Sequence, residues 1–287
     1  MRKLFSANPG LIGRFDGPPK SDAVPASLVH GTPGDLKVDL FALLGKENVL
    51  HRAIDLVQYA SDASPYRLIP QVVVLPRTTE HIVKLFRYCR EKGRHATLRA
   101  AGTSLNGQSQ SDDILIDVRR HWYGAKVEND GHRVRARPGT ILGHVNAMLG
   151  RYGRRLGPDP ASLHACTIGG VIANNSGGMR CTVGNDAYQT VSAMTFVTPS
   201  GAVIDTSAPD AEAAFERAEP DLAIGLLELR GQLLADRELA DRVRRKYSIR
   251  NTHGYRLCAF STARPRSKSF VVFSWDPKER WRSSPRP

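Results

Sequence analysis

The chain has 287 residues, of which 41% are hydrophobic and 24% charged, as is typical of a globular protein with one large domain or two medium ones. No apolar run approaches the roughly 18 residues that a membrane span needs, and the N-terminus lacks the apolar core of a signal peptide, so we expect a cytoplasmic protein. The net charge of +13 comes from basic residues scattered over helical stretches, with a surplus in residues 261–287, so we expect solvated faces and no nucleic-acid partner.

The first part of the chain predicts an irregular arm followed by alternating helices and strands. Residues 1–37 are rich in Pro, Gly and Ser and predict the arm. Apolar residues at helical spacing predict helix over residues 38–60, and a β-branched run predicts a strand over residues 71–75. A helix should then run over residues 78–93, with a threonine at its start that can cap it and Gly93 to end it.

Further along, turn residues separate short strands and longer helices. Strands are predicted at residues 96–100 and 114–118, on either side of a glycine-rich stretch. Two hairpins are predicted, over residues 125–137 and 193–205. The remaining predicted helices cover residues 140–151, 209–216 and 222–247.

The four cysteines are too far apart to suggest a metal site. None has a C-x-x-C partner, so we expect reduced, mostly buried thiols and no metal. They are Cys89, Cys166, Cys181 and Cys258.

Two glycine-rich stretches are the most informative part of the sequence. Residues 99–109 read RAAGTSLNGQS, and residues 156–184 contain the pairs Gly169-Gly170 and Gly177-Gly178. Small residues let backbone N–H groups approach an anion closely. Neither stretch is a P-loop or a G-x-G-x-x-G fingerprint. Two such stretches suit a long ligand that contains a diphosphate, such as a dinucleotide.

Six motifs occur in an order that resembles a known family. They are PRTTEHI (76–82), RAAGTSLNGQS (99–109), RARPGT (135–140), LGPDPAS (156–162), TIGGVIANNSGGMRCTVG (167–184) and MTFVTPSGAVIDT (194–206). Together they resemble the FAD-binding domain of the p-cresol methylhydroxylase/vanillyl-alcohol oxidase superfamily. Within it the chain is most similar to the D-lactate/D-2-hydroxyglutarate dehydrogenase branch, in particular to large bacterial enzymes with an iron–sulfur region after the FAD-linked oxidase region. The resemblance covers about residues 40–260.

The resemblance implies an α+β fold with two subdomains and FAD between them. It divides the chain into the arm (1–37), an FAD-binding domain that is incomplete at its C-terminal side (38–260) and a basic tail (261–287). In the family, the stretch around residue 103 holds the diphosphate, and the residues after 156 surround the flavin side. The implied FAD-binding residues are Pro76, Ala101, Gly102, Thr103, Ser104, Leu105, Gly107, Gln108, Pro158, Asp159, Thr167, Gly169, Gly170, Asn174, Asn175, Gly177 and Gly178.

Several side chains near these motifs keep more than one interpretation. Asp159 is either a flavin neighbour or a loop carboxylate with a structural role only. His164 and Arg180 are more simply solvated or structural groups than catalytic ones, so no catalytic residue is assigned. Family members that bind FAD covalently often have histidine where this chain has Thr103, which predicts non-covalent FAD.

The resemblance ends after Phe260, and the segment that follows is rich in Ser, Arg and Pro. Its composition predicts a disordered tail. Back-translation of residues 275–282 in another reading frame allows the Gly-Ser-Glu-Gly-Thr-Leu turn that the family has here. We therefore hypothesise a frameshift, with the substrate domain and its catalytic groups absent from this chain, and expect the chain itself to be inactive.

The resemblance implies an FAD-dependent oxidoreductase that acts on a small D-2-hydroxyacid. Hydride would pass from the substrate to flavin N5, and the electrons would leave to a quinone, cytochrome or iron–sulfur acceptor. Two alternatives stay open: a non-catalytic FAD-binding protein from a broken reading frame, and a flavin reductase of the same fold. The substrate, the acceptor, the oligomeric state and any peripheral membrane attachment are not determined.

Overall fold

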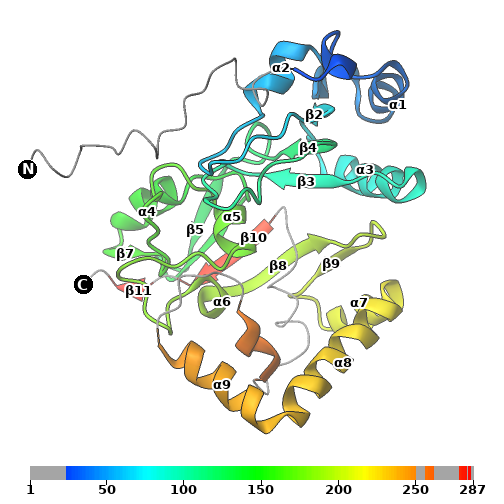
Figure 1. The fold of residues 1–287 in the computed structure, drawn as a ribbon. Coiled ribbons are helices and arrows are strands. Elements are labelled where there is room, and N and C mark those ends of the chain that lie inside the picture. The colour runs from blue at the N-terminus through cyan, green and yellow to red at the C-terminus, as the bar shows by residue number, and fades with distance from the viewer. Residues whose placement is uncertain (1–23, 250–255, 262–277, 283, 286–287) are drawn as a thin grey trace, which may run out of the picture.

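Two β-sheets organise the fold, one in each half of the molecule (Figure 1). The computed structural model describes residues 24–249, 256–261, 278–282 and 284–285. The first sheet has the strand order β1-β2-β4-β3, and the second has the order β5-β6-β10-β8-β9. Helices pack against both sheets, so the predicted α+β fold with two subdomains is confirmed.

The first sheet is buried on both faces. Its strands, in sheet order, are β1 (Val49–Leu50), β2 (Val72–Val74), β4 (Ile114–Asp117) and β3 (Ala96–Arg99), and β4 is parallel to both of its neighbours. Ile116 of β4 packs into a core with helices α1 (Gly34–Leu44) and α3 (Thr79–Lys92). The next residue towards the N-terminus, Leu115, lies in a second core with α2 (Ala53–Gln58). Because parallel strands end at one edge, the segments that follow β2, β3 and β4 leave the sheet together.

Helix α3 begins and ends where the sequence predicts. The Thr78 hydroxyl accepts a hydrogen bond of 3.2 Å from the backbone N–H of His81, which caps the first turn. Gly93 ends the helix with a φ of 62°, a left-handed conformation that glycine adopts without strain. The chain then enters β3, which leads directly into the first glycine-rich stretch.

The second sheet is antiparallel, and the two predicted hairpins form its two ends. Its strands, in sheet order, are β5 (Ala125–Glu128), β6 (Arg133–Ala136), β10 (Lys278–Arg282), β8 (Val191–Val197) and β9 (Val203–Asp205). The turn between β5 and β6 uses Asn129, Asp130 and Gly131, which all have positive φ. Asn, Asp and Gly tolerate this conformation best, which is why the sequence predicts the hairpin correctly.

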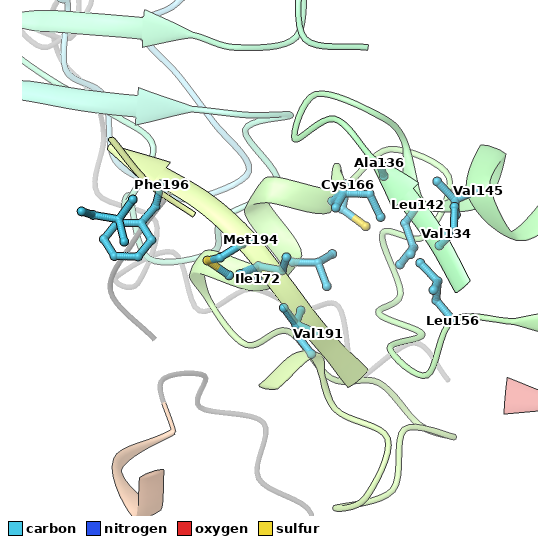
Figure 2. Close-up of a cluster of buried hydrophobic side chains, with 14 of the residues drawn as sticks. Val134, Ala136, Leu142, Val145, Leu156, Cys166, Ile172, Val191, Met194 and Phe196 are labelled. Atoms are coloured by element: carbon cyan, nitrogen blue, oxygen red, sulfur yellow. The ribbon is translucent and has the colours of Figure 1, made fainter. Parts of the chain in front are cut away.

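Helices α4 (Leu142–Gly150) and α5 (Ile168–Ala173) close the core of the second sheet (Figure 2). Ile172 of α5 packs in the same cluster as Met194 and Phe196 of β8. The residue after Phe196, Val197, lies instead in the core of the first sheet. Strand β8 therefore joins the two cores and fixes the position of α5 relative to the first subdomain.

The remaining elements connect or flank these layers. They are the 3-10 turns η2 (Ala26–Leu28), η3 (Lys46–Asn48) and η4 (Leu257–Ser261), the short strands β7 (Arg154–Arg155) and β11 (Ser284–Pro285), and the helices α6 (Ala187–Thr190), α7 (Ala211–Ala218), α8 (Pro220–Ala235) and α9 (Arg237–Ser248). Helices α7, α8 and α9 gather at the end of the molecule opposite α1 and α2 (Figure 1). In the part of the chain that the structure describes, no helix is both long and apolar enough to span a membrane.

The single helix predicted over residues 38–60 is wrong. Helix α1 begins at Gly34, inside the predicted arm, and ends at Leu44 because Gly45 adopts a φ of 86°. The chain then forms η3 and β1 before α2 starts at Ala53. The apolar residues at helical spacing belong to two short helices that pack in different cores.

The long helix predicted over residues 222–247 is also divided. Asp236 leaves the helical conformation with a ψ of 95°, and its carboxylate accepts a hydrogen bond of 2.9 Å from the N–H of Leu239. Aspartate is a favoured N-cap, so α9 starts anew at this residue.

The expectation of a disordered tail does not hold for residues 278–282, which form β10. This strand pairs with both β6 and β8, for example Arg280 with Arg135 and with Ala193. Without it, β6 and β8 would have no partner on their facing edges. The segment 262–277, where the tail begins, lies outside the described residues.

Candidate cofactor site

The fold brings the two glycine-rich stretches together. Gly170 lies in α5, and a Cβ atom added there would be 3.4 Å from the Cβ of Ala100, at the end of β3. We call residues 100–109 the phosphate loop and residues 156–184 the second segment. Pro76 follows β2 at the same sheet edge, and its carbonyl accepts a 2.8 Å hydrogen bond from the indole N–H of Trp122. The start of the phosphate loop and helix α5 of the second segment therefore lie side by side.

The phosphate loop leaves six consecutive backbone N–H groups unpaired. The amides of residues 100–105 donate to no other group among the described residues. Ser104 instead organises the far half of the loop: its hydroxyl bonds the side chain of Gln108 and accepts from the N–H groups of Asn106 and Gln108 at 3.3 and 3.2 Å. Leu105 is 72% exposed. A row of free amides in a loop of small residues is a geometry that binds anions.

Two glycines of the loop are required by their surroundings. Gly102 has a φ of 69°, and a Cβ there would lie 2.8 Å from Nη2 of Arg99. Gly107 has a φ of 76°, and a Cβ there would lie 3.0 Å from the ring of Tyr66. Side chains at these positions would face both backbone strain and a close contact.

A segment that sequence reasoning missed holds the loop from outside. We call residues 59–67 the strap. The N–H of Ala63 donates to the Gly102 carbonyl at 2.9 Å. The carboxylate of Asp62 accepts from the Ser109 hydroxyl at 2.7 Å and from the Gln110 amide at 2.9 Å. The strap thus fastens both ends of the phosphate loop.

The Asp62 carboxylate is well suited to this role. Burial by itself would raise its pKa, but hydrogen bonds from Ser64, Ser109 and Gln110 outweigh burial and lower the pKa. The only sequence signal was the run Asp62-Ala63-Ser64, in which the N–H of Ser64 donates back to Asp62 at 2.8 Å as in a local turn.

A charged network lies beneath the loop. Arg99 is 8% exposed, and its guanidinium donates to the carbonyl oxygens of Tyr59 at 2.9 Å and Ser61 at 2.7 Å. The Tyr59 hydroxyl donates to Asp117 at 2.8 Å, and Arg119 forms an ion pair with the same carboxylate at 2.8 Å. Burial, with the charge of Asp117, raises the pKa of Tyr59 to about 12, so its hydroxyl stays a donor at neutral pH.

Helix α5 contributes less to an anion site than the sequence suggests. Thr167 stands at its N-cap, but the hydroxyl does not cap the helix and has no partner among the described residues. The N–H groups of Ile168 and Gly169 donate to the carbonyls of Thr140 and Pro138 at 2.9 and 2.8 Å. These two amides are therefore used within the fold.

Asp159 supports the second segment structurally. Its carboxylate accepts from the N–H groups of Arg180 at 3.0 Å and Cys181 at 2.8 Å. A Cβ at Gly178 would lie 2.0 Å from the Asp159 carbonyl oxygen, so the chain after Pro158 can pass this turn only at a glycine. Of the two interpretations left open for Asp159, the contacts favour the structural one.

The side chains of Asn174 and Asn175 are both held by hydrogen bonds to later residues of the chain. Asn174 ends α5 and donates to Ser176 at 3.2 Å. Asn175 has a φ of 47°. Its side-chain oxygen accepts a hydrogen bond of 3.0 Å from the N–H of Tyr188, and its side-chain NH2 donates to the carboxylate of Asp186 at 3.4 Å.

Asp186 in turn forms an ion pair with Arg256, whose side chain is 8% exposed. The guanidinium of Arg256 also lies 5.0 Å from the centre of the Tyr188 ring. Sequence reasoning did not single out Arg256, because its partner is seventy residues away in the chain.

Two further candidates lie at the margin of the site. His164 packs beside Gly143 of α4, with its Nδ1 3.3 Å from a Cβ added there. Arg180 is exposed, next to Gly177-Gly178 and the 84% exposed Met179. Among the described residues, no group of three His, Cys, Asp or Glu side chains is arranged to hold a metal ion.

Comparisons with known proteins identify sequences and folds that are similar to this chain. Residues 70–207 match the family model of the FAD binding domain. The glycolate oxidase subunit GlcD of Escherichia coli K12 is 30% identical over 136 residues, 46% of this chain and 27% of that protein. The D-2-hydroxyglutarate dehydrogenase of Haemophilus influenzae is 28% identical over 158 residues, 54% of this chain and 15% of that enzyme. The chain therefore spans about a quarter or less of these relatives.

The fold is also similar to that of known flavoproteins. A structure of p-cresol methylhydroxylase with substrate bound matches with a TM-score of 0.60 over 91% of this chain and 45% of that one, at 16% identity. This likeness concerns the fold alone. The resemblance that the six motifs indicate, to the FAD-binding domain of this superfamily, is confirmed.

The ion pair behind Asn175 gives a first prediction. Arg256→Met should lower the free energy of unfolding by about 3–5 kcal/mol, because Asp186 would remain buried without its partner. Urea unfolding followed by circular dichroism measures the change.

Arg217→Met is the matched control, since Arg217 pairs with Asp210 at 3.6 Å on the surface, where both side chains are about two-thirds exposed (68% and 69%). Its loss should stay within about 1 kcal/mol. Equal losses for the two variants would contradict the assignment of a buried, structurally important pair.

Proposed function

We propose that this chain is the FAD-binding part of an oxidoreductase that acts on small 2-hydroxyacids, because residues 70–207 match the family model of the FAD binding domain. The relatives named above are enzymes for glycolate and D-2-hydroxyglutarate, both small 2-hydroxyacids. The alternative of a flavin reductase differs in the electron donor and is distinguished below by experiment.

The observation that carries the proposal is the row of unpaired amides at residues 100–105. A diphosphate is the part of FAD that needs several donors at short range. The loop offers these donors on small residues, has no acidic side chain and is anchored by the strap. The geometry thus fits a dinucleotide that is bound largely by backbone.

The remaining predicted residues fit the rest of such a ligand. None of these residues carries a charge other than Asp159, and Gly170 lies next to the loop; the others are Pro76, Pro158, Thr167, Gly169, Asn174, Asn175, Gly177 and Gly178. When bound, FAD supplies a flavin that accepts hydride at N5. The chain's own contribution is to bind and orient the cofactor.

We propose that the FAD is not covalently attached. Thr103 occupies the loop position at which histidine forms the link in covalent members of the superfamily, and its hydroxyl cannot form that link. An electron acceptor and a cytoplasmic location belong to the same proposal, as the family resemblance implies.

The loop assignment can be tested by one substitution. Gly102→Val should abolish FAD retention, because valine is strained at a φ of 69° and its side chain would collide with Arg99. Glu238→Gln, on the exposed surface of α9, is the control and should leave the flavin content unchanged. The flavin absorbance per protein after desalting is the measurement. Unchanged flavin in the Gly102→Val protein would mean that the phosphate loop lies elsewhere.

The mode of attachment has its own test. After precipitation of the FAD-loaded protein with acid, all flavin should appear in the supernatant, because no side chain of the loop can form a bond to it. The absorbance of supernatant and pellet measures the distribution. Flavin that stays with the denatured protein would overturn the non-covalent assignment.

We further propose that the 287-residue chain alone does not oxidise 2-hydroxyacids at enzymatic rates. Oxidation needs a base within reach of the substrate hydroxyl. Within the phosphate loop and the second segment, the candidate bases are Asp159, which is bonded to two amides, and His164, which packs beside α4.

Anaerobic mixing of the FAD-loaded chain with glycolate, D-lactate or D-2-hydroxyglutarate should therefore leave the visible absorbance band of the oxidised flavin intact over minutes. Rapid bleaching by one of the acids would show that the chain contains a complete active site. Bleaching by NADH and not by the acids would favour the flavin reductase instead.

A further inference from the structure

The phosphate loop has no cationic side chain of its own. Residues 100–109 read AAGTSLNGQS and contain no lysine, arginine or histidine. The nearest cation in the sequence is Arg99, the last residue of β3, whose side chain is 8% exposed. A Cβ added to Gly102 would lie 2.8 Å from its Nη2 and 3.2 Å from its Nε, so the guanidinium lies directly beneath the loop.

The charge of Arg99 is not neutralised by a contact ion pair among the described residues. The Nη1 and Nη2 groups of Arg99 donate to the carbonyl oxygens of Tyr59 and Ser61, and its Nε has no hydrogen-bond partner among the described residues. The neighbouring carboxylates are used elsewhere: Asp117 by Tyr59 and Arg119, and Asp62 by Ser109 and Gln110.

Burying the charged guanidinium of Arg99 lowers the stability of the fold, because the charge loses its contact with water. Burial, followed by the charge of Arg119, lowers the pKa of Arg99, yet a guanidinium remains protonated at neutral pH. The charges of Asp62 and Asp117 act on the pKa of Arg99 in the opposite direction. A buried cation that bonds only carbonyl oxygens still acts on a nearby anion, because the surrounding protein screens it less than water would. The six unpaired amides above it point to the same kind of ligand.

We propose that Arg99 is a positioning residue that supplies the buried positive charge for the diphosphate of FAD and holds the strap beneath the loop. The inference rests on the proposed FAD binding. In this proposal the amides of residues 100–105 contact the diphosphate directly, and the side chain of Arg99, beneath the loop backbone, supplies the positive charge that attracts it. Arg99 would then favour FAD and other nucleoside diphosphates over flavins that lack the diphosphate.

The test compares three ligands on the full chain. Dissociation constants of FAD, ADP and riboflavin are measured by calorimetry or fluorescence for the parent protein and for Arg99→Met, Arg99→Lys and Arg119→Met. Arg119 is the matched control, since it lies in the same network but is half-exposed and paired with Asp117. Circular dichroism and urea unfolding establish that each variant is folded.

Loss of the charge should weaken FAD and ADP by about 10- to 100-fold in Arg99→Met, from a unit charge several ångströms away in a medium of intermediate dielectric. Riboflavin should bind as before. Arg99→Lys should recover part of the affinity, because it keeps the charge although one ammonium cannot span both carbonyls. Arg119→Met should change FAD binding by less than about 3-fold.

Each other result has a distinct meaning. Parental FAD affinity in a folded Arg99→Met protein would overturn the inference. Equal weakening of FAD, ADP and riboflavin, with no recovery in Arg99→Lys, would reduce Arg99 to a structural anchor and also overturn it. If the parent protein binds neither FAD nor ADP, the proposed function itself fails. If Arg99→Met does not fold, the comparison of Arg99→Lys with the parent, on ADP against riboflavin, decides.

Discussion

A turn that leaves six consecutive backbone amides unpaired cannot be held by its own hydrogen bonds. Backbone polar groups are normally satisfied within the fold, so an open row of donors persists only where neighbouring parts hold the chain in place. Here Ala63 and Asp62 hold the two ends of the loop by hydrogen bonds. The buried guanidinium of Arg99 holds the strap beneath it. The requirement for glycine at residue 102 has the same origin, since the supporting guanidinium occupies the space of a side chain.

The second requirement is that the two subdomains meet at a fixed distance. Consecutive residues of β8 achieve this, with Phe196 in one core and Val197 in the other. Ile172 packs against the same strand and places Gly170 of α5 beside Ala100. The two glycine-rich stretches are thus held next to each other, each by its own hydrophobic core.

The sequence predicts what is encoded locally and misses what depends on distant partners. The caps of α3, the hairpin at Asn129 and the phosphate loop follow from short-range rules of turn and cap chemistry, and the family resemblance could be recognised because it lies in such motifs. The helix over residues 38–60 failed because one left-handed glycine, Gly45, outweighs a favourable apolar spacing. The strap has no apolar pattern, and its role appears only once Asp62 is placed next to Ser109. The contact of Arg256 with Asp186 likewise has no signature in either segment.

Two independent links connect the cofactor side of the second subdomain to the last part of the chain. One is electrostatic: Arg256 fixes Asp186, and Asp186 orients Asn175 at the end of α5. The other is a backbone link, because β10 fills the gap between β6 and β8, the strands whose inner faces form the core beneath α4 and α5. Arg256 lies just before the end of the family resemblance at Phe260, whereas β10 lies after it. The pairing of β10 with β6 and β8 uses main-chain hydrogen bonds, which any residue other than proline can form. The second subdomain thus takes the central strand of its sheet from a segment whose sequence does not resemble the family.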